Sequence, residues 1–276
     1  MALMIGIIEE SVQMDLHAED YSRQKRYSAF WERMAQRYPL PFDDKALADT
    51  LRVLSLVKSR GVEFSKADIL DIGCGTGIYT LPLACEAANV TGIDDSENMI
   101  ARMTDVTQSE NIQNVQPIKG SWKNIDISAR GFEKAFDIVW ISMSPAVQTV
   151  QDSRRMEKCA RKWCVYIGWG RKRENALMEE AFRLHDLRYG PPPGVTAAYK
   201  ILEHSGRNPS LDYFETSWEW KGKAEDALED IICFIEMQGG TADQELIKKA
   251  IACHEHDGLI CHTTEVEEGI MVWKVE

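Results

Sequence analysis

The chain lacks the features of a membrane or secreted protein. Its 276 residues contain no apolar run near the roughly 20 residues that a membrane-spanning helix needs. The N-terminal MALMIGIIEE has no basic region, and its apolar part is too short for a signal peptide. None of the seven cysteines stands in a C-x-x-C pair, which indicates reduced thiols. We therefore expect a cytoplasmic protein with no membrane partner.

Basic residues are also in deficit. The chain has 32 Lys and Arg against 44 Asp and Glu, giving a net charge of -12. This balance argues against broad binding to a phosphate backbone and so against a nucleic-acid partner. It does not exclude a nucleic-acid substrate that binds through a local basic patch. The apolar fraction of 44% is ordinary for a globular enzyme, and the length suits one large domain, residues 1–276.

Two phosphate-binding signatures are missing from the most informative stretch, ADILDIGCGTGIYT at 67–80. Gly73, Gly75 and Gly77 are spaced G-x-G-x-G, whereas a dinucleotide fingerprint would require a glycine where Ile78 stands. The Gly-Lys-Ser/Thr ending of a P-loop is absent as well. What remains is a loop whose backbone a bulky, uncharged group can approach closely.

Two acids accompany this loop. Asp71 ends a short apolar run before the glycines, and Asp94 ends the next run, in NVTGIDDSENMI at 89–100. An ordinary strand–helix turn would explain the glycines alone, but not a carboxylate at the tip of both strands. The layout predicts a nucleoside-binding βαβ unit.

LDIGCGTG together with VTGIDDSENMI resembles class I S-adenosylmethionine (SAM) dependent methyltransferases of the small-molecule type, and the resemblance covers about residues 65–170. It implies SAM as the cofactor, with Asp94 on the ribose hydroxyls, Asp71 at the methionine ammonium, Asp95 behind Asp94 and Met99 on an adenine face. The cofactor-binding residues that it implies are Asp71, Gly73, Cys74, Gly75, Gly77, Asp94, Asp95, Met99, Ser121, Trp122 and Ser142.

Two further strand exits carry candidate contacts. Ser121 stands where the family often has an acid near the adenine, and Trp122 either stacks on the adenine or fills the core. Ser142 and Met143 either border the methyl-transfer region or form a plain loop. The following Ser144-Pro145 only partly resembles the motif of enzymes that methylate exocyclic base amines or glutamine, which argues against those substrates.

The apolar and polar patterns alternate along the chain as strand and helix, which predicts a Rossmann-like α/β fold. We expect a seven-stranded, mostly parallel sheet with helices on both faces, a helical cap at 1–62, a SAM-binding core at 63–175 and a C-terminal part at 176–276 with a lid after strand five. The expected strands are 68–72, 90–93, 115–120, 136–142, 162–169, 211–220 and 267–275, and the expected helices are 15–38, 44–60, 79–88, one from Ser96, 150–160, 174–188, 225–238 and 242–256.

Substrate contacts are predicted from the flanks. FWERMAQRY resembles the helix that folds over the SAM pocket in small-molecule methyltransferases, which makes Trp31 and Tyr38 lid candidates, with core packing as the alternative. In WGRKR at 169–173, Arg171 is a candidate for holding a substrate carboxylate or phosphate, with a solvated helix start as the alternative. The catalytic residue is not evident; His204 in the expected lid at 190–210 is a candidate base, with an exposed loop histidine as the alternative.

One cluster suggests a metal, but its spacing matches no standard zinc pattern. His254 and His256 are two residues apart and cannot share a helix face. We therefore expect no metal at Cys253, His254, His256, Cys261 and His262.

The sequence thus predicts a SAM-dependent methyltransferase that acts on a small or medium-sized molecule. Two alternatives stay open: a SAM-binding sensor without catalysis, and a methyltransferase that acts on protein or RNA. A general base is needed only if the acceptor arrives protonated, so the lack of an evident catalytic pair does not argue against the reaction.

Overall fold

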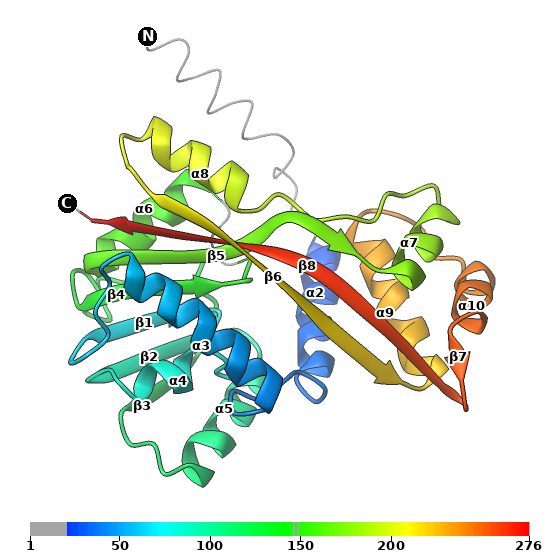
Figure 1. Cartoon of the computed structure of the whole chain (residues 1–276), viewed down its shortest axis with the longest axis horizontal. Coiled ribbons are helices and arrows are strands. Elements are labelled where there is room, and N and C mark those ends of the chain that lie inside the picture. Colours follow the sequence, from blue (N-terminus) through cyan, green and yellow to red (C-terminus); the bar gives the residue numbers. More distant parts are fainter. Residues whose placement is uncertain (1–20, 146, 148, 276) are drawn as a thin grey trace.

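One mixed sheet forms the centre of the molecule (Figure 1). The computed structural model describes residues 21–275 except 146 and 148, with side chains from residue 27 on. Within them the strand order is β3-β2-β1-β4-β5-β8-β6, with the short β7 paired to β8, so the predicted fold class is confirmed. The strands are β1 (Asp68–Ile72), β2 (Asn89–Asp94), β3 (Val115–Lys119), β4 (Phe136–Ser142), β5 (Ala160–Glu174), β6 (Ser210–Gly222), β7 (Glu255–His256) and β8 (Leu259–Lys274).

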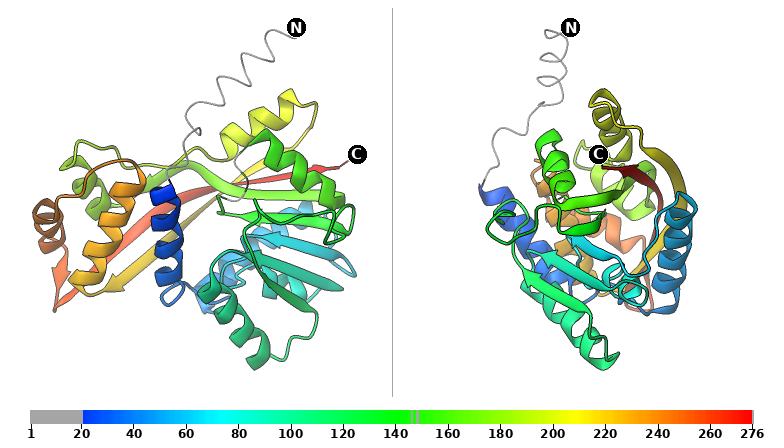
Figure 2. Two further views of the ribbon diagram at one scale, coloured as in Figure 1. Left: turned by 180° about the vertical axis from the view of Figure 1, so that it is seen from behind. Right: turned by 90° about the vertical axis from the view of Figure 1, so that its left-hand side faces the viewer.

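Helices cover both faces of the sheet (Figures 1 and 2). Val53, Leu54 and Val57 of α3 pack on one face, and Met156 of α6 with Leu202 of α8 belongs to the core on the other. No helix among the described residues is long and apolar enough to cross a membrane. The helices are α2 (Tyr21–Met34), α3 (Asp44–Ser59), α4 (Thr80–Ala84), α5 (Glu97–Ser109), α6 (Val150–Cys159), α7 (Ala176–Arg183), α8 (Val195–His204), α9 (Ala224–Met237) and α10 (Gln244–Ala252).

Parallel pairing of β1, β2, β3, β4 and β5 brings their carboxyl ends to one edge. The antiparallel β8 lies between β5 and β6. In open α/β sheets ligands bind beyond this edge, so residues that follow these strands are the ones to examine.

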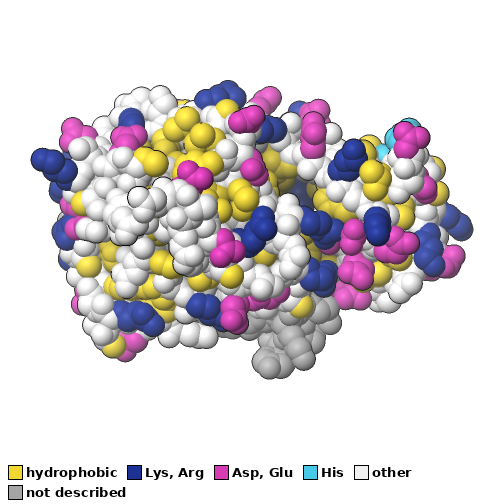
Figure 3. Space-filling view, turned by 90° about the horizontal axis from the view of Figure 1, so that it is seen from below, with side chains coloured by type: hydrophobic (Ala, Val, Ile, Leu, Met, Phe, Trp, Pro, Cys, Tyr) yellow, Lys and Arg dark blue, Asp and Glu magenta, His cyan; other side chains and the backbone are white. Residues whose placement is uncertain are grey.

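Two strands, β5 and β8, run much farther than predicted, and β6 exceeds its predicted range by three residues. β5, β6 and β8 extend past the rest of the sheet and carry α7, α9 and α10 around a separate apolar cluster (Figure 1). Seen from below, this smaller end lies beside the larger body, and basic and acidic side chains are interspersed over the face (Figure 3).

The start of β8 illustrates why the predicted boundaries were wrong. The expected helix 242–256 ends at Ala252, and Asp257 and Gly258 then adopt φ of 51° and 75°. Two residues with positive φ make the type I′ hairpin turn that Asp-Gly favours, so β7 pairs back onto Leu259 and Ile260. β8 therefore begins eight residues before the predicted 267–275.

Helix α2 is tied to the carboxyl edge at two points. Glu32 accepts hydrogen bonds from the backbone N–H of Glu97 and Asn98, at 2.8 and 3.0 Å, so its carboxylate lies at the positive N-terminus of α5. After α2, the hydroxyl of Thr76 donates to the carbonyl of Pro39 at 2.7 Å. The part of the predicted helix 15–38 before Tyr21 lies outside the described residues.

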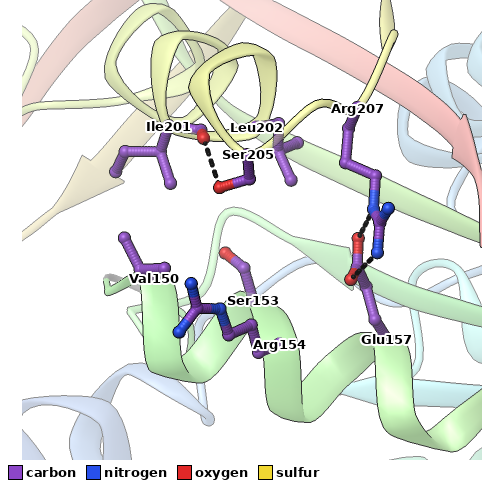
Figure 4. A pocket seen from close by; sticks show the side chains of 8 residues that line it. All are labelled: Val150, Ser153, Arg154, Glu157, Ile201, Leu202, Ser205 and Arg207. Carbon is purple, nitrogen blue, oxygen red and sulfur yellow. Dashed lines mark hydrogen bonds and ion pairs between the residues drawn. The ribbon is translucent and has the colours of Figure 1, made fainter. Parts of the chain in front are cut away.

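The segment predicted as a lid contains α8, which packs through Val195 and Leu202 into the core with Cys164 of β5 and Met271 of β8. Near its end, Arg207 pairs with Glu157 of α6, as Figure 4 shows beside a pocket of about 140 Å³. The division of the chain into cap, core and C-terminal part stays a prediction.

Removing Glu157 should destabilise this end of the fold. The buried carboxylate accepts from Arg207 Nε at 2.9 Å and Nη2 at 3.0 Å, and from Trp273 Nε1 at 2.8 Å. Glu157→Ala removes the acceptor that joins Arg207 to Trp273, which should lower the free energy of unfolding by about 3 kcal/mol in urea titrations. Glu180→Ala, which breaks the exposed pair with Arg183, should cost less than about 1 kcal/mol. Equal effects of the two variants would contradict this assignment.

Candidate active site

The glycine loop is bound to the end of β2. The backbone N–H groups of Gly73 and Cys74 both donate to the carbonyl of Ile93, at 2.7 and 3.0 Å. Gly73, Gly75 and Gly77 have φ of 74°, 55° and 90°, a left-handed conformation that residues with a Cβ rarely adopt. The loop therefore turns sharply beyond the carboxyl ends of β1 and β2.

The three glycines differ in what surrounds them. A Cβ at Gly73 would lie 2.1 Å from Ser144 Oγ, and one at Gly77 would lie 2.8 Å from Met103 Cγ. A Cβ at Gly75 would meet only Met99 Sδ, at 4.0 Å. Gly73 and Gly77 thus allow close packing inside the protein, whereas Gly75 leaves backbone open to a ligand.

Asp94 lies directly beside that open backbone. Its Oδ2 accepts from the N–H of Gly75 at 2.9 Å, and its Oδ1 accepts from the N–H of Ser96 at 2.8 Å. Each carboxylate oxygen has a second lone pair, so two hydroxyl groups of a ligand can still donate to Asp94. Burial raises the pKa of this carboxyl to about 6, while the two backbone hydrogen bonds lower it.

Asp71 is buried deeper, with 2% of its surface exposed. Its Oδ2 accepts from the hydroxyl of Thr80 at 2.6 Å. Burial raises the pKa of Asp71 to about 7, with the charge of Asp94 adding to the effect. No basic side chain forms an ion pair with Asp71 or Asp94 within the described part of the chain.

Several other predicted cofactor residues lie around these acids. Asp95 is exposed beside Asp94, and Met99 is buried at the start of α5, where its N–H donates to Ser96 Oγ at 3.1 Å. Cys74 faces inward and packs with Leu81 and Met103. Its backbone, rather than its thiol, therefore belongs to the loop surface.

The residues after β3 divide into one at the surface and one in the core. Ser121 is partly exposed. Trp122 is 3% exposed, lies in the core beside Ile93 and Val139, and has the guanidinium of Arg155 4.5 Å from its ring centre. The core alternative holds for Trp122 in this structure, which leaves its ring no face for an adenine.

The end of β4 completes the edge. The hydroxyl of Tyr79 hydrogen-bonds to Ser142 and its ring lies 5.1 Å from that of Trp140. Met143 has φ of 48°, and its N–H donates to the carbonyl of Ile167 at 2.8 Å. Both Ser142 and Met143 thus lie at the strand exit where the sequence predicted them.

Aromatic residues of α2 and the following turn lie next to the two acids. The ring of Trp31 is 5.9 Å from Tyr27 and 6.0 Å from Tyr38. Burial, with the nearby charges of Glu268 and Asp94, raises the pKa of Tyr38 to about 12. Trp31 and Tyr38 therefore belong to one aromatic cluster near these acids, and their role as a lid stays a prediction.

Glu268 is a residue that the sequence reasoning missed. It lies on β8, opposite Trp169 of β5 and Phe214 of β6, and only 7% of its surface is exposed. No hydrogen bond or ion pair links its carboxyl to another described residue. Burial raises its pKa to about 7, with Asp49 adding to the effect, and its charge in turn acts on Tyr38 and Tyr79. Glu268 thus belongs with the groups around Tyr38 and Tyr79.

Two predicted residues lie away from this group. Arg171 is exposed and pairs with Glu267, with its Nη2 2.8 Å from Oε2, while its guanidinium lies over Tyr213. His204 is exposed at the end of α8, and its Nδ1 is 2.6 Å from the carbonyl of Lys200. Because neighbouring Arg207 reaches Glu157 at the end of α6, His204 lies toward the amino end of the sheet.

The cysteine and histidine cluster is spread over a helix end and a hairpin. His262 stacks on Trp220 at 5.1 Å and contacts Asn175 Nδ2 at 2.8 Å, while Cys253 and Cys261 are exposed. Burial lowers the pKa of His262 to about 4. Across the described ranges no group of three or more His, Cys, Asp or Glu side chains is arranged to hold a metal ion.

Comparison with known proteins identifies the glycine loop as part of a methyltransferase domain, whose family matches residues 69–164. The chain is 36% identical over 63 residues to the 23S rRNA (uracil(1939)-C(5))-methyltransferase of Tolumonas auensis. The matched segment covers 23% of this chain and 14% of that protein. It is 34% identical over 61 residues to the ubiquinone biosynthesis O-methyltransferase of Rickettsia prowazekii, covering 22% of this chain and 24% of that protein. Each match therefore spans less than a quarter of either protein.

A solved structure extends the likeness over most of the fold. Phosphoethanolamine N-methyltransferase 1 of Haemonchus contortus, in complex with phosphoethanolamine and S-adenosylhomocysteine, is similar over 91% of this chain and 50% of that chain, with 14% identity and a TM-score of 0.51. At this identity the likeness supports the class I fold rather than a shared substrate.

Replacing Asp71 should change how stability depends on pH. Its folded pKa of about 7 is above the ordinary 3.8, so between those values the unfolded chain is ionised while the folded protein stays protonated, and stability falls as pH rises. At 1.36 kcal/mol per pKa unit the full effect is about 4 kcal/mol. Asp71→Asn should therefore gain stability relative to wild type between pH 4 and pH 8 in urea unfolding. For the exposed control Asp105→Asn, the difference in unfolding free energy from wild type should stay constant over this pH range. A difference for Asp71→Asn that also stays constant would refute the assignment.

Proposed function

We propose that this chain, whose residues 69–164 belong to the methyltransferase domain family, transfers the methyl group of SAM to a small or medium-sized acceptor. The observation that carries the proposal is the pair of acids, buried Asp71 and partly buried Asp94, beside backbone that is open at Gly75. Neither acid has a basic partner in the described part of the chain.

The chemistry of these residues suits SAM, which has a sulfonium, an ammonium and a ribose diol. Asp94, with one lone pair free on each oxygen, would accept both ribose hydroxyls, and charge-assisted hydrogen bonds of this kind are strong. Asp71 would face the ammonium directly or through water. Nearby positive charge lowers carboxyl pKa values, so binding of a cation would stabilise the ionised form of both acids.

When bound, SAM would supply an already activated methyl group, so the protein's contribution is position and exclusion of water. Trp31, Tyr27 and Tyr38 lie in contact at the edge and would cover the reacting atoms. Ser142 and Met143 at the end of β4 would border the acceptor.

Glu268 would accept a proton from the acceptor. Glu268 lies on β8 opposite Trp169, and its charge, like that of Asp94, acts on Tyr38. A carboxyl whose pKa is about 7 can remove a proton from a hydroxyl or ammonium near neutral pH. Because its pKa is matched to that task, we assign it the role of base.

A small acceptor is favoured over RNA by the distribution of charge. The net charge is -12, and on the face in Figure 3 basic side chains are interspersed with acidic ones. RNA binding usually relies on a basic surface that follows the phosphate backbone. Both sequence matches are partial: the O-methyltransferase of ubiquinone biosynthesis is matched over 24% of its length and the rRNA methyltransferase over 14%.

Asp94 should be required for SAM binding. Calorimetric titration of the wild type with SAM and its demethylated product should give micromolar dissociation constants. Asp94→Ala should weaken both by tenfold or more, about 1.4 kcal/mol, because the ribose loses its acceptors. Asp105→Asn on the exposed face of α5 serves as the control and should bind as the wild type does.

The same titration separates the alternatives. Absence of binding by the folded wild type would refute the methyltransferase proposal. Binding without turnover across a broad acceptor screen would indicate a sensor, and tight association with RNA that weakens steeply with salt would indicate an RNA substrate.

Glu268→Gln should reduce turnover about a hundredfold while leaving the SAM dissociation constant unchanged. The wild-type rate should rise with pH through about 7, because the carboxyl must lose its proton to act, and the variant should lack this rise. Demethylated product is measured between pH 5.5 and 8.5 with an acceptor from the screen. A variant that keeps the wild-type pH profile would show that Glu268 is not the base.

A further inference from the structure

The basic run at the end of β5 separates into two kinds of side chain. Arg171 pairs with Glu267, and Lys172 pairs with Glu265 and Glu174, all three acids lying on β8 or β5 itself. Arg173 faces the opposite way from Arg171. Its guanidinium forms no ion pair with a carboxylate of any described residue.

Three aromatic rings enclose Arg173. Its guanidinium carbon lies 4.6 Å from the ring centre of Trp169, 4.6 Å from that of Tyr189 and 5.6 Å from that of Phe234. The hydroxyl of Tyr189 also hydrogen-bonds to it. Its Nε is buried and lacks a hydrogen-bond partner. The rings contact the guanidinium chiefly through π faces, which leaves N–H donors at its edge.

This arrangement is costly without an anion. Cation–π contacts contribute about 0.5–2 kcal/mol each. The Arg173 side chain is partly exposed, but its Nε is buried without a hydrogen-bond partner, and an unsatisfied buried donor costs about 1–3 kcal/mol. Burial accordingly lowers the pKa of Arg173. A carboxylate or phosphate that accepts from the guanidinium edge would supply the missing partner in the bidentate geometry that arginine favours.

The position of Arg173 connects it to the candidate active site. Arg173 pairs with Val266 and Trp169 pairs with Glu268, and residues two apart on a strand share a face. Arg173, Trp169 and Glu268 therefore lie on the same face of the β5–β8 ladder. The ring of Trp169, which the guanidinium of Arg173 contacts, belongs to the residue directly opposite Glu268 in this ladder.

The aromatic cage is also continuous with the cap. Phe234 of the cage lies 4.9 Å from Phe30 of α2, and Phe30 lies 5.2 Å from Trp31. Trp31 in turn contacts Tyr38 beside the acids. A mostly apolar wall thus joins the enclosed arginine to the edge where SAM is proposed to bind.

We propose that Arg173 binds an oxyanion, a carboxylate or a phosphate, carried by the methyl acceptor, and that the rest of the acceptor is apolar. This inference rests on the proposed function. With the anion at Arg173, the apolar body would lie along Trp169 and the nucleophilic atom would face Glu268. The acceptor would then be oriented by two opposite charges at its two ends.

The test uses the full chain and pairs of probes that differ only in the anion. Hydroxy- and amino-substituted benzoates are compared with their primary amides, and the corresponding phenyl phosphates form a second arm. Each probe is titrated calorimetrically into protein saturated with demethylated SAM, and methyl transfer from SAM is followed in parallel. The carboxylate or phosphate member of at least one pair should bind tenfold or more tightly than its neutral partner, and the two arms distinguish the kind of oxyanion.

Variants then assign the preference to this residue. Arg173→Gln should remove the preference for the anion while the SAM dissociation constant stays within twofold, and Arg173→Lys should keep part of it. Arg183→Gln, an exposed arginine on α7 paired with Glu180, should keep all of it.

Three results would overturn the inference: equal binding of anionic and neutral probes by the wild type, no binding of any anionic probe by protein that binds SAM, or an intact preference in Arg173→Gln. If Arg173→Gln does not fold, the comparison of Arg173→Lys with wild type decides. Loss of the bidentate fork should weaken binding of the carboxylate probe but not binding of the amide probe. Failure to bind SAM would instead count against the proposed function itself.

Discussion

Three carboxyl groups, two buried and one partly buried, have no basic partner among the described residues, and the arrangement of the site follows from that constraint. Asp71, Asp94 and Glu268 come from β1, β2 and β8, and burial raises the pKa of each. Elsewhere in the fold buried acids are paired, as Glu157 is with Arg207. Unpaired carboxyls are therefore concentrated where a cationic ligand would stabilise them, which is what SAM offers.

The local part of this site could be predicted from sequence. Asp71 and Asp94 each end a short apolar run, and the glycines between them require a sharp turn, so neighbours in the chain determine the geometry. The limits of β1 and β4 follow the apolar runs for the same reason and agree with prediction. Ser96 also begins a helix as predicted, because its hydroxyl accepts from the N–H of Met99.

Residues whose role depends on distant pairing could not be predicted in this way. Glu267 and Glu268 are both buried, and the register of β8 against β5 decides which of them shares a face with Trp169. The irregularity between Trp169 and Arg173 decides the same for Arg171 and Arg173. His204 was placed near the site because it follows strand five in the chain, but α8 packs back along the sheet. In each case a contact between residues far apart in the sequence determines where the side chain lies, and the local sequence pattern does not predict that contact.

The extended strands explain how one edge can serve ligands of opposite charge. Asp94 lies at the glycine loop, whereas Glu268 lies opposite Trp169 on β8 and Arg173 lies farther along β5, with its guanidinium carbon 4.6 Å from the ring centre of Trp169. Phe234, which also contacts this guanidinium, continues through Phe30 to Trp31 at the carboxyl edge, so a mostly apolar wall joins the two regions. Because Glu268 and the Nε of Arg173 have no hydrogen-bond partner among the described residues, each end of this wall keeps a polar group that a ligand of opposite charge would satisfy.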